Sequence, residues 1–260
     1  MRHPYFGEPG SVLALAHRGF SPTGLENTMA AFQAAIDLGF RYVETDAHGT
    51  CDGVAVALHD PTLDRTTDRT GAVAELRWTH VGRALVGGVE PVPRIEDVLG
   101  TWPDLRLNID IKARSAIGPV AAAIERTTAH DRVCVTSFSA ERRDATLARL
   151  SRPVATGAAT AECGLFLAAG ATGRLPARAA RRVDAFQVPW RLRAGRDPRR
   201  PLVTEHHVSA AHRSGRLVHV WTVDDATTMR ALLDRGVDGI ISNRADLLRD
   251  VLVERGLWGV

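Results

Sequence analysis

Lysine and cysteine are scarce in this chain of 260 residues, and long apolar runs are absent. Its three cysteines, Cys51, Cys134 and Cys163, are odd in number and have no CxxC spacing, which argues against a disulfide framework or a structural zinc site. No apolar run approaches the roughly 20 residues that cross a bilayer, and the first residues lack a secretory signal pattern. We therefore expect a cytoplasmic protein with no stable membrane anchor.

The basic residues are almost all arginine, since Lys112 is the single lysine among 33 basic side chains. A compact ammonium that persists against this bias suggests a task that a planar guanidinium cannot perform, although chance survival at the surface is the alternative. The basic residues are spread along the chain without interleaved aromatics, so nucleic acid is not an expected partner. The net charge of +3 favours a small anionic ligand.

Short β-branched runs alternate with longer stretches of helical period, which predicts parallel strands joined by crossover helices. The length suits one α/β domain over residues 1–260, a (β/α)₈ TIM barrel. The expected strands are Val12–Ala16, Arg41–Asp46, Leu105–Ile111, Val133–Thr136, Pro153–Thr156, Asp184–Val188, Leu217–Trp221 and Gly239–Ile241. The expected helices are Thr28–Leu38, Ile117–Thr128, Glu141–Leu150, Glu205–Ser214, Ala226–Arg235 and Ala245–Glu254.

Two stretches depart from this alternation. The segment 51–99, between the second and third barrel strands, has turn signals and little helical period, so we expect an insertion over one end of the barrel. The fifth unit, 157–182, is rich in Ala, Gly and Arg, and its helix is weakly indicated. No heptad or separate apolar face predicts an oligomeric state.

Polar residues gather where the expected strands end, which is where barrel enzymes carry their catalytic groups. His17 and Arg18 follow the first strand. On the second strand, Glu44 and Asp46 share one face with His48, because side chains alternate along a strand.

The third strand repeats this arrangement, with Asn108, Asp110 and Lys112 on one face. Three acids at one barrel mouth repel each other unless a cation lies between them. Oxygen ligands of this kind suit one Mg²⁺ or Ca²⁺ better than zinc. The alternative is a network of ion pairs with neighbouring arginines.

A short strand within the insertion ends at His59, which predicts a second imidazole near the same mouth. Two histidines beside a phosphate can share the roles of general base and general acid. Lys112 would neutralise one phosphate oxygen, and Arg18 would bind another in bidentate fashion.

These residues resemble the signatures of the glycerophosphodiester phosphodiesterase family along nearly the whole chain. The matching segments are Ala16-His17-Arg18-Gly19, Glu26-Asn27-Thr28, Glu44-Thr45-Asp46, Asp52-Gly53, His59-Asp60 and Ile109-Asp110-Ile111-Lys112, with weaker likeness at Ser137-Phe138, Gln187-Val188-Pro189, Trp221-Thr222-Val223 and Asp238-Gly239-Ile240. Many family members carry Glu at the position of Asp110.

The resemblance implies hydrolysis of glycerophosphodiesters to sn-glycerol 3-phosphate and an alcohol. It implies that His17 and His59 form the acid/base pair, and that Glu44, Asp46 and Asp110 hold the metal. Glu26 would lie near the metal or the substrate glycerol, whereas the residues alone also allow Glu26-Asn27-Thr28 to cap a helix. Trp221, at the end of the seventh strand, is expected to form an apolar wall for the substrate, with a place in the core as the alternative.

Two other functions fit the same residues. A phosphodiesterase that acts on lysophospholipids or sphingolipids would need an apolar surface near the mouth, for which Trp78, Val81, Leu85 and Val86 are the candidates, although packing on the barrel is the more ordinary role. A non-catalytic barrel that binds phosphorylated ligands is the third possibility.

Overall fold

Eight parallel strands form the centre of the molecule in a computed structural model, which describes residues 2–169, 175–176, 179, 181–191 and 202–259. These strands are β1 (Leu13–His17), β2 (Tyr42–Gly49), β6 (Arg106–Ile111), β7 (Val133–Thr136), β8 (Ala155–Thr156), β9 (Ala185–Pro189), β10 (Leu217–Trp221) and β11 (Gly239–Ser242). Each contains part or all of one expected strand, because buried β-branched and apolar runs between turns favour strands.

The strands form a ring in the order β8-β7-β6-β2-β1-β11-β10-β9. An isolated parallel bridge between Gly157 and Ala185 joins the two ends of this series, and the Ala158 N–H donates to the Ala185 carbonyl at 2.9 Å. The barrel is therefore closed by a short bridge at this junction rather than by a full ladder. The expected TIM-barrel fold is confirmed.

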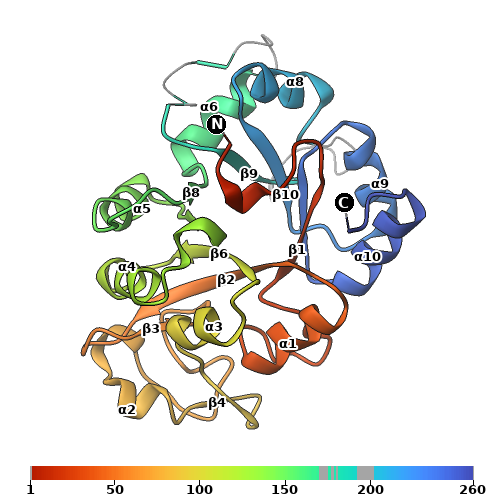
Figure 1. Cartoon of the computed structure of the whole chain (residues 1–260). Helices are drawn as coiled ribbons and strands as arrows, with labels where there is room; N and C mark the ends of the chain where they lie inside the picture. The colour runs from red at the N-terminus through yellow and green to blue at the C-terminus, as the bar shows by residue number, and fades with distance from the viewer. Residues whose placement is uncertain (1, 170–174, 177–178, 180, 192–201, 260) are drawn as a thin grey trace.

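Helices follow the strands and surround them (Figure 1). They are α1 (Met29–Asp37), α3 (Ile95–Thr101), α4 (Ile117–Arg126), α5 (Ala140–Leu147), α6 (Thr160–Ala169), α8 (Glu205–Arg213), α9 (Ala226–Asp234) and α10 (Ala245–Glu254). All six expected helices are present. The weakly indicated fifth unit contains α6, while 170–174, 177–178 and 180 lie outside the described residues. No helix in the described part of the chain is sufficiently long and apolar to cross a membrane.

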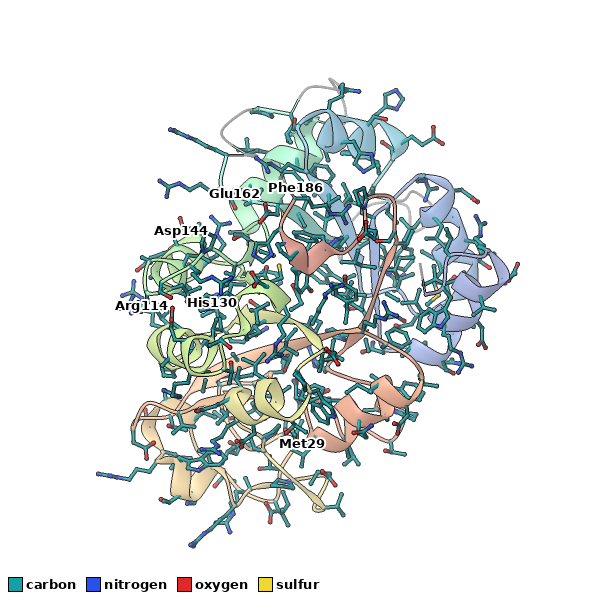
Figure 2. All side chains as sticks on the ribbon, viewed as in Figure 1. Met29, Arg114, His130, Asp144, Glu162 and Phe186 are labelled. Carbon is teal, nitrogen blue, oxygen red and sulfur yellow. The ribbon has the colours of Figure 1, made fainter. Side chains whose placement is uncertain are left out.

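The layer between strands and helices is densely apolar (Figure 2). Phe186 of β9 stacks on Phe166 of α6 with ring centroids 4.5 Å apart. Inside the barrel, the 3-10 helix η1 (Pro4–Phe6) places Tyr5 and Phe6 in a second buried cluster with Leu13, near the strand beginnings. The N-terminal end of the barrel is thereby filled, which leaves the opposite end for polar groups.

The segment after β2 forms an insertion with its own elements, namely β3 (Ala55–Ala57), η2 (Val73–Glu75), α2 (Trp78–Val81), β4 (Leu85–Val86) and β5 (Glu90–Pro91). Strand β3 pairs antiparallel with the end of β2, so the insertion is joined to the barrel sheet. The sequence predicts little helix over 51–99, and this prediction is wrong for the last residues of the segment, because α3 begins at Ile95. Ile95, Val98 and Leu99 recur at helical spacing and are buried in the main core.

The apolar residues of the insertion pack on each other. Val81 and Val86 are fully buried in a small separate core, and Trp78 packs against it. These side chains stabilise the insertion and do not form an exposed apolar surface, so packing is the role that the structure shows for them.

Candidate active site

His17 lies at the end of β1 with its ring nitrogens in defined surroundings. Its Nδ1 is 2.7 Å from Oδ1 of Asn243, whose amide group donates to Asp224 Oδ2 at 2.8 Å. Because the Asn243 oxygen can only accept, His17 Nδ1 carries the proton and Nε2 carries the lone pair. Nε2 lies 3.6 Å from Glu44 Oε2. Burial, and next the charge of Arg18, lower the pKa of His17, so its neutral form is favoured.

The acids of β2 and β6 lie next to each other inside the barrel mouth. In the strand register, Asp46 is paired with Asp110 and Glu44 with Asn108, and all four side chains are buried. Leu107, Ile109 and Ile111 alternate with these polar residues along β6 and lie in the apolar layer between strands and helices. The expected sharing of one face by Asn108 and Asp110 is therefore confirmed. Burial, and next the charge of Asp46, raise the pKa of Glu44 well above its usual range.

Two basic side chains extend between these acids. The ammonium of Lys112 is 3.2 Å from Asp46 Oδ1 and 3.2 Å from Asp110 Oδ2, and Arg18 Nε is 3.0 Å from Asp46 Oδ2. Burial raises the pKa of Asp46, but Arg18 and Lys112 outweigh this effect and the pKa is lowered. Ion pairs with basic neighbours, which were the alternative to a cation at this mouth, are therefore present, through Arg18 and through Lys112. Among the described residues, no group of three or more His, Cys, Asp or Glu side chains is arranged to hold a metal ion.

The helix-cap question at Glu26-Asn27-Thr28 is resolved by contacts. The Thr28 hydroxyl accepts the Ala31 N–H at 3.1 Å, so Thr28 is the N-cap of α1. Glu26 Oε1 instead accepts from Arg18 Nη1 at 3.1 Å, and the Asn27 amide donates to Asp46 Oδ2 at 3.1 Å. The loop after β1 thus directs one acid and one amide toward the residues of the mouth.

His59 follows β3 and is held from two sides. Its Nδ1 is 2.6 Å from Asp60 Oδ1, and its carbonyl accepts from His48 Nε2 at 3.2 Å. Arg65, on the other side of Asp60, contacts both carboxylate oxygens of that residue. A carboxylate at Nδ1 retains the proton there, which leaves Nε2 of His59 for proton exchange.

An aromatic pair lies beside Lys112. Trp221, at the end of β10, packs edge to face against Phe138 with centroids 5.8 Å apart, and the Lys112 ammonium is 5.7 Å from the Phe138 centroid. Phe138 is 55% exposed, whereas Trp221 is partly buried against the second buried cluster, the one inside the barrel that contains Tyr5 and Phe6. Trp221 thus lies partly against the core and partly against an exposed ring near the mouth, and its role as an apolar wall for the substrate stays a prediction.

Several side chains of this site were not predicted as site residues from the sequence. Asn243 directly follows β11, and Asp224 lies three residues after the end of β10, so the strand-end criterion that identified His17 could have found them. In the sequence, Asp60 stands out only as part of the His59-Asp60 motif. Arg65 lies within the insertion, where no strand end marks it.

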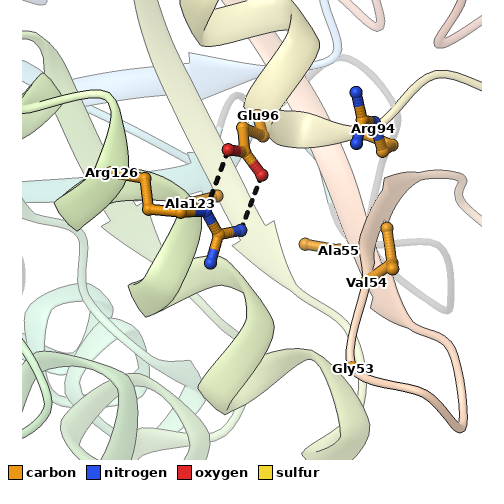
Figure 3. Close-up of a pocket in the computed structure, with 7 residues that line it drawn as sticks. All are labelled: Gly53, Val54, Ala55, Arg94, Glu96, Ala123 and Arg126. Carbon is orange, nitrogen blue, oxygen red and sulfur yellow. Dashed lines mark hydrogen bonds and ion pairs between the residues drawn. The ribbon is translucent and has the colours of Figure 1, made fainter.

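A pocket of about 190 Å³ lies elsewhere, among the start of β3, α3 and α4 (Figure 3). Its charged groups are already paired. Arg126 donates twice to Glu96, at 2.8 and 2.6 Å, and Arg94 donates to Asp97 at 2.7 Å. Neither histidine of the mouth is among its lining residues, so this pocket lacks the acid and base groups that phosphodiester hydrolysis needs.

Known proteins resemble the chain over nearly its full length. A sequence relative from Mycobacterium tuberculosis, "Probable glycerophosphodiester phosphodiesterase 2", is 48% identical over 252 residues, which cover 96% of this chain and 94% of the relative. A solved glycerophosphodiester phosphodiesterase from Agrobacterium tumefaciens superposes with a TM-score of 0.76 at 23% identity, covering 93% of this chain and 99% of that one.

A phosphodiesterase from Oleispira antarctica, solved in complex with the product sn-glycerol-3-phosphate, superposes with a TM-score of 0.75 at 18% identity, covering 94% of this chain and 97% of that chain. At these identities the structural likeness supports the fold. The model of the glycerophosphoryl diester phosphodiesterase family matches residues 17–247, from the first histidine of the mouth to the last helix. The chain therefore belongs to the glycerophosphoryl diester phosphodiesterase family.

Proposed function

We propose that the protein hydrolyses glycerophosphodiesters to sn-glycerol 3-phosphate and an alcohol. The observation that carries this proposal is the pair of histidines whose Nδ1 atoms are each engaged by a fixed oxygen, Asn243 Oδ1 for His17 and Asp60 Oδ1 for His59. Both Nε2 atoms are thereby available to move protons. The family membership and the product bound by the Oleispira antarctica protein support the choice of substrate.

The residues allow a simple division of labour. Lys112 and Arg18 supply positive charge for the non-bridging phosphate oxygens. When water attacks, one histidine accepts its proton while the P–O bond to the alcohol breaks, and sn-glycerol 3-phosphate forms directly. When the neighbouring glycerol hydroxyl attacks instead, the same step gives a cyclic phosphate, which a second attack by water then opens to sn-glycerol 3-phosphate. The other histidine donates a proton to the departing oxygen. Because burial favours neutral His17, we assign His17 as the acceptor and His59 as the donor.

We also propose that Glu44, Asp46 and Asp110, which are not arranged as a metal-binding group in this structure, would move together to hold one divalent cation, Mg²⁺ or Ca²⁺. Their donor set consists of oxygens alone, and Asp110 Oδ1 is buried without a hydrogen bond from any described residue, which is a position that a hard cation would satisfy. The raised pKa of Glu44, caused by burial and Asp46, marks a carboxyl group short of positive charge. The ion would withdraw charge from the phosphate and lower the energy of its negatively charged transition state.

The decisive experiment measures release of glycerol 3-phosphate from glycerophosphocholine, glycerophosphoethanolamine and glycerophosphoglycerol. The enzyme is first chelated and then assayed without metal and with Mg²⁺, Ca²⁺ or Mn²⁺. We expect product only with metal, together with a rise in melting temperature when the effective cation is added without substrate. Product without any metal would overturn the metal proposal alone, whereas absence of product under all conditions would overturn the proposed reaction.

Lysophosphatidylcholine belongs in the same panel, because release of its headgroup faster than that of glycerophosphocholine would indicate a lipid-directed enzyme. Saturable binding without turnover would indicate a binding protein. The burial of Val81 and Val86 gives the lipid alternative no support.

A further inference from the structure

Arg65 connects two acids that come from different parts of the chain. Its Nη2 donates to Glu26 Oε1 at 2.7 Å and to Asp60 Oδ1 at 3.2 Å, and its Nε donates to Asp60 Oδ2. Glu26 belongs to the loop after β1, whereas Asp60 and Arg65 belong to the insertion. One guanidinium group therefore joins the insertion to the barrel at the mouth.

The contact with Asp60 bears on His59. The Asp60 carboxylate accepts from Arg65 through both of its oxygens, and Oδ1 also faces His59 Nδ1 at 2.6 Å. The hydrogen bond from Arg65 is the largest cause that lowers the pKa of Asp60 to about 2. Asp60 therefore stays ionised and oriented, which in turn fixes the tautomer and ring orientation of His59.

The contact with Glu26 bears on Arg18. Glu26 Oε1 accepts from both Arg65 and Arg18, at 2.7 and 3.1 Å, so one carboxylate oxygen lies between two guanidinium groups. Arg18 in turn lies 3.0 Å from Asp46. Through this chain of contacts, the position of Arg65 affects the guanidinium that we assign to the phosphate.

We propose that Arg65 is a positioning residue that orients His59 through Asp60 and Arg18 through Glu26, so that the insertion sets the geometry of the mouth. This inference rests on the proposed phosphodiesterase function. A guanidinium suits the task because its planar fork reaches two carboxylates at once, which the point charge of a lysine cannot do.

If Arg65 had a purely structural role, replacing it would lower folding stability. Its side chain is 50% exposed, and exposed ion pairs contribute little to folding stability. Replacing it should therefore leave the fold intact and alter the site. Arg69 is a matched control, because it lies in the same insertion and its Nε donates to the Arg83 carbonyl instead of to an acid of the mouth.

The experiment begins with wild-type turnover of a glycerophosphodiester, because an inactive wild type would remove the proposed function before this inference is tested. Arg65→Ala should then lower kcat by about 10- to 100-fold, as loss of an orienting partner of a functional histidine commonly does. KM should change little, Arg65→Lys should recover only part of the rate, and Arg69→Ala should match the wild type. Melting temperatures of all four proteins check the fold.

Added guanidinium chloride, below denaturing concentrations and compared with equal sodium chloride, should restore part of the kcat of Arg65→Ala and leave Arg69→Ala unaffected. A merely structural loss would not respond in this way. Three results would overturn the proposal: unchanged kcat in Arg65→Ala, a rise in KM with unchanged kcat, which would indicate direct substrate binding, or a loss of kcat that guanidinium does not reverse.

Discussion

Replacement of Lys112 offers the sharpest test of how charge is used at the mouth. Its ammonium is 3.2 Å from both Asp46 and Asp110 and its side chain is 19% exposed. A unit charge about 4 Å from a phosphate oxygen contributes roughly 4 kcal/mol at an effective dielectric constant near 20. If most of this stabilisation applies to the transition state, Lys112→Ala should lower kcat/KM by about 10²- to 10³-fold.

The variant Lys112→Arg separates charge from shape. A guanidinium has the same charge but spreads it over a larger plane, and here the ammonium lies between two carboxylates on neighbouring strands. We expect Lys112→Arg to lose at least about tenfold in kcat/KM. Arg114→Ala is the control, because Arg114 lies two residues away, is 78% exposed and pairs with Glu141 outside the mouth.

The assay is steady-state release of glycerol 3-phosphate, with melting temperatures to exclude unfolding. Wild-type rates for Lys112→Arg would mean that the one lysine of the chain persists by chance. Wild-type rates for Lys112→Ala would refute the argument that this ammonium stabilises charge on the substrate.

Three further predictions concern the histidines and the buried ion pairs. His17→Ala and His59→Ala should each lower kcat by about 10²- to 10⁴-fold while melting temperatures stay close to that of the wild type, and full activity in either variant would remove that residue from the mechanism. His219 is fully buried, and burial is the main cause that lowers its pKa to about 4. As pH falls below about 6.5, the His219 imidazole therefore becomes protonated in the unfolded chain before it does so in the folded protein. The wild type should therefore lose about 3 kcal/mol more unfolding free energy between pH 7 and pH 4 than His219→Gln does, in urea titrations; equal losses would show that His219 is not responsible. Arg143 is 1% exposed and donates to Glu162 and to the Gly157 carbonyl, so Arg143→Met should cost about 3 kcal/mol of unfolding free energy, and a loss below about 1 kcal/mol would contradict this.

The stabilising role of Arg143 is independent of the proposed chemistry. It joins α5 to α6, the helices that carry Asp144 and Glu162 (Figure 2). A double variant, Arg143→Met with Glu162→Met, should recover part of the stability, because much of the cost of losing the arginine is a carboxylate left without its partner. This contrast distinguishes a paired buried charge from simple loss of packing.

The sequence by itself determined the eight-stranded barrel and one face of its mouth. Alternation along a strand is a local property, so the shared faces of Glu44 with Asp46 and of Asp110 with Lys112 follow from spacing alone. The same is true of the strand-end positions of His17 and Trp221, because apolar runs mark where strands stop. The helix α3 was missed because turn signals over the preceding residues masked a helix of only seven residues.

Only the tertiary structure decided how these groups contact one another. Asn243 reaches His17 across 226 positions of the chain, and Arg65 reaches Glu26 across 39. Such contacts depend on how the barrel closes and how the insertion folds back, and no local pattern encodes them. The structure likewise placed Lys112 between Asp46 and Asp110, where burial makes an unpaired charge costly and the ammonium relieves that cost.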